Sequence, residues 1–113
     1  MTAPNDEQND KKNELFWTLA EPLLARPQVT RGTMMGFPCL RVDGGFFASL
    51  DHKNADLIVK LPRERVMNLI EDGDGLPFAP AGRTFREWIR VPTPDADAWR
   101  ALMAESMTFV AGS

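Results

Sequence analysis

The residues of this sequence best suited to binding chemistry are basic side chains grouped around one tryptophan. Arg86, Trp88 and Arg90 alternate along a stretch expected to be extended, so they would share one face of a strand. A tryptophan between two guanidinium groups could stack a nucleobase or anchor a partner protein. In the alternative interpretation, Trp88 lies in the core and the aliphatic parts of the arginines pack around it. The other basic candidates are Lys53, Lys60, Arg63 and Arg83.

No pattern in the sequence indicates a catalytic centre. Asp51 and His52 form the only acid–histidine neighbour pair, and His52 is the only histidine. Adjacent residues in a turn point apart, and a hydrolytic centre also needs a nucleophile held by its base. The sequence contains no Gly-x-Ser-x-Gly motif. We therefore predict that His52 is a solvated turn residue and that the protein is not an enzyme.

Metal and cofactor binding are not predicted either. Zinc sites need several cysteines or histidines at short spacing, and here Cys39 and His52 stand alone, 13 residues apart. The acidic residues 71–75 lack the ladder of oxygen ligands and the final glutamate of a calcium loop, so they predict a helix-ending turn. Gly44 and Gly45 are not placed between a strand and a helix, so they indicate a hairpin and no phosphate-binding loop.

Length and charge restrict the class of protein further. A chain of 113 residues with 43% apolar residues is expected to form one domain. Its net charge is −3, with nine basic and eight acidic residues in the segment 31–91 and acidic excesses at both ends. This balance lacks the basic excess of a non-specific nucleic-acid binder. The polar N-terminus does not resemble a signal peptide and no apolar run reaches membrane-spanning length, so we expect a cytoplasmic protein without membrane contact.

The first expected element is a helix that follows a mobile tail at residues 1–9. From about Asp10, apolar residues recur every three or four positions and predict one buried stripe. Pro22 removes a backbone donor, so the helix would either kink there or stop near Glu21 and restart with a short turn. The domain itself is expected to span residues 10–113.

The middle of the chain predicts an antiparallel meander. Strands are expected over residues 29–35, 38–43, 46–50 and 56–61. Asp43, Gly44 and Gly45 lie between two alternating runs and tolerate the positive φ of a tight hairpin turn. Cys39, in the second of these strands, is expected to be a small buried apolar residue.

The remainder predicts two helices and two short strands. A helix over residues 62–72 should begin with Pro62 and end before Gly73, and strands are expected over 76–79 and 86–91. Thr93 is expected to cap the last helix, whose buried stripe would contain Trp99, Leu102, Met103, Ser106, Phe109 and Val110. The order α-β-β-β-β-α-β-β-α predicts an α+β fold with one antiparallel sheet of about five or six short strands and three helices.

Several segments resemble a known family. The run Thr30–Ala48, the segment Leu57–Pro62 and the segment Arg86–Pro92, with its Trp-Ile-Arg-Val-Pro pattern, are similar to the TfoX N-terminal-domain and MmcQ/YjbR group of small bacterial proteins. The resemblance covers roughly residues 13–111. It implies an α+β domain with one antiparallel sheet, comparable to a double-wing DNA-binding module. TfoX itself is associated with the regulation of natural competence.

Together these observations favour a non-enzymatic binding or regulatory module. The first hypothesis is a protein partner, bound through the sheet face with Trp88 and its flanking arginines as anchors. The alternative is weak nucleic-acid binding through Lys53, Lys60, Arg63, Arg83, Arg86 and Arg90, with Trp88 stacking on a base. An enzyme or small-molecule binder without a recognisable motif is the third hypothesis. The sequence leaves the first two open.

Overall fold

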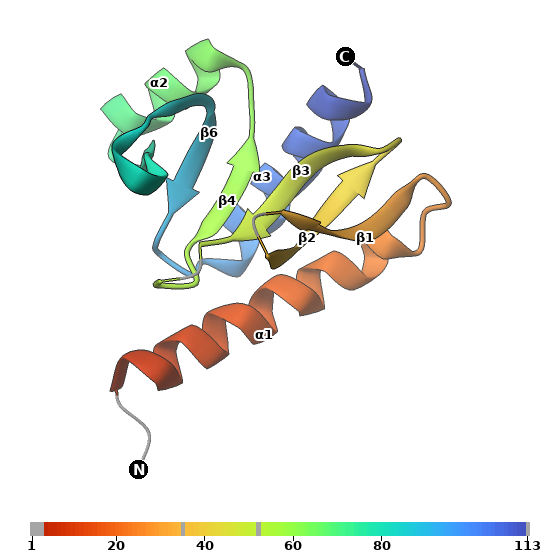
Figure 1. Ribbon diagram of the computed structural model, residues 1–113, viewed down its shortest axis with the longest axis horizontal. Helices are drawn as coiled ribbons and strands as arrows, with labels where there is room; N and C mark the ends of the chain where they lie inside the picture. Colours follow the sequence, from red (N-terminus) through yellow and green to blue (C-terminus); the bar gives the residue numbers. More distant parts are fainter. Residues whose placement is uncertain (1–3, 35, 52, 113) are drawn as a thin grey trace.

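The computed structural model describes residues 4–34, 36–51 and 53–112, which form one antiparallel sheet and three α-helices (Figure 1). The six strands are ordered β1-β2-β3-β4-β6-β5. This arrangement confirms the predicted α+β class and element order. The elements are α1 (Pro4–Leu24), β1 (Val29–Met34), β2 (Phe37–Val42), β3 (Gly45–Leu50), β4 (Leu57–Lys60), α2 (Arg63–Glu71), β5 (Leu76–Phe78), the 3₁₀ turn η1 (Pro80–Gly82), β6 (Phe85–Val91) and α3 (Ala96–Ala111).

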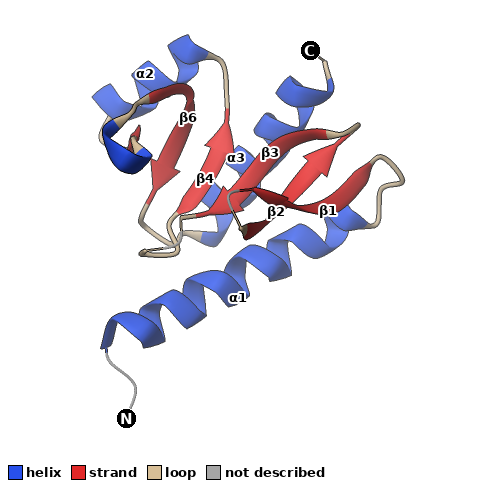
Figure 2. Ribbon diagram, in the orientation of Figure 1, coloured by secondary structure: helices blue, strands red, loops and turns tan. Residues whose placement is uncertain are grey.

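The three helices pack on the same side of the sheet. Phe16 of α1, Val66 of α2 and Trp99 of α3 belong to one buried cluster that also contains Leu40 and Val59 of the strands. Figure 2 shows the strands as one layer, with α2 beside β6 and α3 behind β3 and β4. The alternation of side chains along a strand therefore divides the sheet into a helix-covered face and a second face, which we call the open face.

The strand register assigns residues to the open face. Cys39 pairs with Ser49, Ser49 with Ile58, and Ile58 with Arg90, so these four residues form one row across β2, β3, β4 and β6. Their neighbours along each strand belong to the apolar helix-covered face, where Leu40, Ala48, Val59 and Ile89 pair in turn. Lys60 pairs with Trp88 and continues the open face along β4 and β6.

The first helix is longer than the sequence predicted. It begins at Pro4 instead of near Asp10, so residues 4–9, expected as part of a mobile tail, continue the helix. It also runs through Pro22 to Leu24, so of the two predicted alternatives the one in which the helix stops near Glu21 is wrong. Tertiary contacts hold the helix in place near the predicted start, because Asn9 and Lys12 both bond to the turn after β3. Residues 1–3 lie outside the described part of the chain.

The last helix has a different cap from the predicted one. Asp95, and not Thr93, is the N-cap, and its carboxylate accepts a hydrogen bond of 3.0 Å from the Ala98 N–H. The Thr93 carbonyl oxygen instead accepts a 2.8 Å hydrogen bond from Trp99 Nε1. Trp99, Leu102, Met103 and Ser106 are buried as predicted, whereas Phe109 is only half-buried.

Ser106 satisfies two backbone groups where β3 and β4 separate. The last paired residues of these strands are Ala48 and Val59. Beyond them, the Ser106 hydroxyl donates to the Phe47 carbonyl oxygen at 2.7 Å and accepts from the Lys60 N–H at 3.1 Å. A polar residue is therefore stable at this buried position because it replaces a bond of the strand ladder.

The turn after α2 has the predicted glycine end. Gly73 adopts φ +79°, its N–H donates to the Ile70 carbonyl oxygen, and the Asp74 N–H donates to the Leu69 carbonyl oxygen. These two bonds form a Schellman motif, which satisfies carbonyl groups that a helix end leaves unpaired. The acidic residues 71–75 thus act as the helix-ending turn that the sequence predicted.

The β2–β3 hairpin depends on its two glycines for different reasons. Asp43 and Gly44 both have positive φ, +51° and +86°, as a two-residue primed turn requires. Gly45 lies in β3 without a positive φ, so the predicted reason is wrong for this residue. A Cβ atom at Gly45 would lie 2.8 Å from Val110 Cγ1 of α3. This glycine is required because the helix approaches the strand closely.

We expect Gly44→Val and Gly45→Val together to lower the free energy of unfolding by more than about 1 kcal/mol, because one strains the turn and the other pushes α3 away from β3. Urea unfolding of the double variant and of each single variant would measure the loss. If Gly45→Val alone left stability unchanged, the close packing of the α3 end on this hairpin would be disproved. Val110→Ala should partly rescue Gly45→Val, since it removes the methyl group that the new Cβ meets.

Candidate functional site

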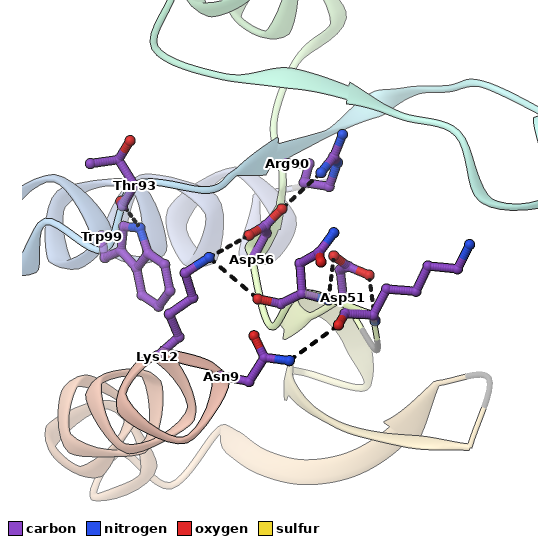
Figure 3. Close-up of polar contacts among 9 residues, drawn as sticks. Asn9, Lys12, Asp51, Asp56, Arg90, Thr93 and Trp99 are labelled. Carbon is purple, nitrogen blue, oxygen red and sulfur yellow. Dashed lines mark hydrogen bonds and ion pairs between the residues drawn. The ribbon is translucent and has the colours of Figure 1, made fainter. Parts of the chain in front are cut away.

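A buried carboxylate joins α1, β6 and the turn before β4. The Asp56 side chain is only 2% exposed. One of its carboxylate oxygens lies 2.8 Å from Lys12 Nζ and the other lies 2.8 Å from Arg90 Nη1, so it forms an ion pair with each cation. Figure 3 shows the two cations approaching Asp56 from opposite elements. The cluster contains two positive charges and one negative charge, so it has a surplus of one positive charge. Both cations are more exposed than the carboxylate, and Arg90, at 29%, is the more exposed of the two.

The turn between β3 and β4 is held by side chains at both ends. The Asp51 carboxylate accepts hydrogen bonds from the backbone N–H groups of Lys53 and Asn54. Asn9 Nδ2 donates to the Lys53 carbonyl oxygen at 3.1 Å, and Lys12 Nζ contacts the Asn54 carbonyl oxygen at 3.3 Å (Figure 3). Helix α1 therefore fixes the position of this turn as well as the charge cluster.

A cavity of about 540 Å³ lies on the open face beside this cluster. Ser49, Ile58 and Arg90, from the row described above, form part of its lining. The turn after β3 lines one side and the segment 77–81, from β5 into η1, lines another. Its apolar lining residues are Phe37, Leu50, Ile58, Pro77, Phe78, Ala79, Pro80 and Ala81. Cavities of this size and composition are typical of small-molecule sites.

Two alanines have unusual backbone conformations: Ala81, which lines the cavity, and Ala55, which follows the lining residue Asn54. Ala55, in the turn after β3, has φ +56°, and Ala81, in η1, has φ +55°. Such values are uncommon for a residue with a Cβ atom and each costs free energy. Among the described residues other than glycine, only Asp43 of the hairpin also has a positive φ. Backbone strain at Ala81 in one wall, and at Ala55 next to the other, favours a binding role for the cavity.

Charge is distributed unevenly between the sheet and the helices. The six strands, all within the described residues, contain five basic residues and a single acidic one, Glu87. Glu87 alternates with Ile89 on the helix-covered side, and the Arg31 guanidinium lies 4.4 Å from the Trp17 ring centre of α1. The strands therefore give the open face basic side chains and no carboxylate. These basic residues are Arg41, Lys60, Arg86 and Arg90.

The structure brings some of the predicted binding residues together. Lys60, Trp88 and Arg90 share the open face, and Lys53 and Arg90 line the cavity. Trp88 is half-buried, so it is neither a core residue nor a fully exposed platform. Arg86 is exposed on the same strand, two residues before Trp88.

The remaining predicted residues are more peripheral. Arg63 is exposed at the first position of α2. Arg83 follows η1, outside the strands, with its guanidinium 5.8 Å from the Phe85 ring centre. His52 lies outside the described residues, so its predicted role is not addressed.

Sequence reasoning missed the buried charge cluster and most of the cavity lining. Lys12, Asp56, Phe37 and Phe78 come from four segments separated in sequence, and no spacing rule connects them. Asp56 alone gave a possible signal, because an acidic residue directly before the apolar strand 57–60 must be either exposed or paired. Its partners could be found only in three dimensions.

Two side chains have altered pKa values. Burial raises the pKa of the Cys39 thiol, although the nearby Arg41 guanidinium and a backbone hydrogen bond from Gly32 oppose the change. Cys39 is fully buried in β2, which confirms the prediction of a small buried residue. The hydrogen bonds from Arg65 to Glu105, which join α2 to α3, raise the pKa of Arg65.

The described part of the chain has neither a group of metal-binding side chains nor a helix that could span a membrane. In residues 4–34, 36–51 and 53–112, no three His, Cys, Asp or Glu side chains are grouped closely enough to hold a metal ion. None of the helices in this part of the chain combines the length and apolar character needed to span a membrane. The charge cluster around Asp56 contains one carboxylate and two cations, which is the opposite of a cation site.

Comparison with known proteins does not assign this arrangement to a family. No protein-family model matches the chain, and no match was found among curated proteins or among solved structures.

Proposed function

We propose that the protein is a non-enzymatic binding module whose open sheet face engages an acidic segment of a partner protein. The observation that carries this proposal is the separation of charge described above. The open face has basic side chains from β2, β4 and β6, whereas the only acidic strand residue, Glu87, is on the helix-covered side. A partner segment rich in Asp and Glu would complement this face.

Aromatic residues on the same face favour a protein partner. Phe46 and Trp88 are half-buried, with the Arg41 guanidinium 5.7 Å from the Phe46 ring centre and Lys60 paired with Trp88. Tryptophan and arginine are the residue types that most often dominate the binding energy of protein interfaces. The net charge of −3 disfavours long-range attraction to a polyanion such as nucleic acid. We also propose, from the resemblance of its sequence segments, that the protein is related to the TfoX N-terminal-domain and MmcQ/YjbR group.

Selection of random peptides displayed on phage would test the proposal. We expect the selected peptides to contain an excess of Asp and Glu together with an aromatic residue, because both features complement the open face. The double variant Lys60→Glu/Arg86→Glu should weaken binding of a selected, fluorescein-labelled peptide by about tenfold or more. Arg90 is left unchanged, since a glutamate there would lie beside the buried Asp56 carboxylate.

The matched control is Lys11→Glu/Arg100→Glu, which makes the same change in net charge on exposed positions of α1 and α3. This control should retain the affinity of the wild type within about twofold, a difference near the usual experimental scatter. Equal weakening by both double variants would show that only net charge matters. That result, or a failure to enrich any acidic peptide, would refute the proposal.

Single-stranded nucleic acid is the second candidate, favoured by two half-buried aromatic residues beside cations on one sheet face. With about three to five phosphate contacts, the binding constant should fall with salt at a log–log slope of about −2 to −3.5 for single strands and about −3 to −4.5 for duplex DNA. Fluorescence anisotropy with labelled single- and double-stranded DNA at low salt would measure it. Binding that is absent, or unaffected by Lys60→Glu/Arg86→Glu, would eliminate this candidate and leave the protein partner.

A further inference from the structure

We propose that the cavity between the turn after β3 and the segment 77–81 binds a small organic acid, a molecule with one carboxylate and an aromatic or otherwise apolar body. This site adjoins the partner surface proposed above and shares Arg90 with it. The two proposals are tested through different residues, the cavity through Arg90 and its walls and the partner surface through Lys60 and Arg86. The proposal rests on the charge of the Asp56 cluster, the free donors of Arg90 and the composition of the walls.

The first argument is the surplus positive charge beside the cavity. Lys12 and Arg90 share one buried carboxylate, Asp56, so the cluster is not neutral. Lys12 is 13% exposed and does not line the cavity, whereas Arg90 is 29% exposed and does. The surplus charge is therefore accessible from the cavity side. An anion bound there would neutralise the cluster in surroundings less polar than water, where charge pairing is stronger.

The second argument is the hydrogen-bonding capacity of Arg90. A guanidinium group has five N–H donors in a planar arrangement that matches a carboxylate. Nη1 donates to Asp56 Oδ2, and this is the only hydrogen bond of the Arg90 side chain to a described residue. The Asp56 bond holds the guanidinium in one orientation, so little side-chain freedom would be lost when a ligand carboxylate binds the remaining donors.

The third argument concerns the other groups that face the cavity. Asp51 also lines it, but each of its carboxylate oxygens already accepts a backbone N–H, and the charge of the neighbouring Lys53 balances it. The Ser49 hydroxyl donates to the Pro38 carbonyl oxygen and retains acceptor capacity. Most of the remaining lining is apolar, with the Phe78 and Phe37 rings among it. These features select an apolar body next to a single anionic group.

Size supports a small molecule over a macromolecular segment. A cavity of about 540 Å³ falls within the range of sites that enclose drug-sized ligands. Hydrogen bonds also hold one wall in place. The turn is held by Asp51 and by helix α1, and the opposite wall turns sharply at Ala81. A preformed cavity loses less entropy on binding than a mobile one.

The test uses three probes with the same ring and different charges: indole-3-acetate, indole-3-acetamide and tryptamine. Chemical-shift titration of the ¹⁵N-labelled full chain would measure each Kd and identify the residues affected. We expect the acid to bind at least about tenfold more tightly than the amide, and the amine to bind most weakly. Shifts should concentrate at residues 49–51, 53–54 and 77–81. Equal affinity for the acid and the amide would overturn the proposal.

Two variants distinguish a loss of binding from a loss of folding. Arg90→Lys preserves the charge beside Asp56 but loses the planar donors, so it should weaken acid binding while leaving amide binding almost unchanged. Ala79→Trp adds bulk at an exposed lining residue without altering charge, and it should abolish binding of both probes. Its matched control is Ala104→Trp, at an exposed position of α3. Equal affinities of these two tryptophan variants for indole-3-acetate would show that the cavity is not the site.

A last arm separates a free acid from the carboxyl terminus of a peptide, which has the same chemistry. The peptide Gly-Gly-Trp with a free carboxylate presents the same ring and charge with an attached chain. We expect it to bind no more tightly than indole-3-acetate, because the cavity is filled by the ring and the carboxylate. Tighter binding of the peptide would overturn the assignment to a small molecule.

Discussion

Replacing Trp99 by alanine is expected to lower the free energy of unfolding by about 3–5 kcal/mol, a large share of the total stability of a small domain. Trp99 is fully buried at the start of α3 and belongs to the cluster that joins all three helices to the sheet. Its Nε1–H also donates to the Thr93 carbonyl oxygen at 2.8 Å, which fixes the chain between β6 and α3. The substitution removes both the packing and this bond.

Urea unfolding followed by circular dichroism would measure the effect, and two further variants separate its causes. Trp99→Phe keeps most of the ring volume and loses the hydrogen bond, so we expect a smaller loss of about 1–2 kcal/mol. Trp88→Ala makes the same change at a half-buried position on the open face and should cost clearly less than Trp99→Ala. If the two alanine variants were equally stable, Trp99 would not have the central packing role described here.

Removal of the Asp56 carboxylate has the second largest expected effect. Asp56→Ala leaves two cations without their shared partner: Arg90, which lines the cavity, and Lys12, which belongs to α1. Breaking a buried ion pair by removing one partner typically costs about 3–5 kcal/mol, because the remaining charge is left uncompensated. We expect a loss in this range, measured by urea unfolding, together with release of the α1 N-terminal half from the turn after β3.

Hydrogen exchange would show that release directly, as faster exchange of the amides in the first turns of α1. The control is Arg100→Met, which removes the exposed pair between Arg100 and Asp97 of α3 and should have no measurable effect. A compensating variant, Lys12→Met/Asp56→Ala, leaves only Arg90 unpaired and should recover part of the lost stability. Stability of Asp56→Ala close to that of the wild type would mean that the cluster is not a structural element.

Local sequence features determined the class of fold and nearly all of its elements. Strand alternation, the Asp43–Gly44 turn and the Gly73 helix end depend on residues adjacent in sequence, and the structure confirms each of them. The buried stripe of α3 was also predictable, since it follows from the helical repeat alone. Each of these features depends on residues that are close together in the sequence, and a sequence pattern can describe interactions over that range.

Features that depend on distant contacts were not predictable. Asn9 and Lys12 of helix α1 bind partners more than 40 residues away, and Gly45 is needed because Val110 lies against it. The Thr93 carbonyl oxygen accepts a hydrogen bond from Trp99 Nε1, and Asp95 caps the helix in place of Thr93. This difference depends on the packing of α3.

In the candidate site, local sequence patterns predicted one group of residues, and contacts between distant residues added the rest. Sequence alone proposed Trp88 with Arg86 and Arg90 as a group, since alternation along one strand is local. Only the tertiary structure joined Arg90 to Asp56 and Lys12, and only it placed Phe37 and Phe78 around the same cavity. A strand pattern specifies which face a side chain occupies, whereas the partners on that face depend on strand order and helix docking. Strand order and helix docking are determined by burial of the whole apolar cluster, so they cannot be inferred from the type of any single residue.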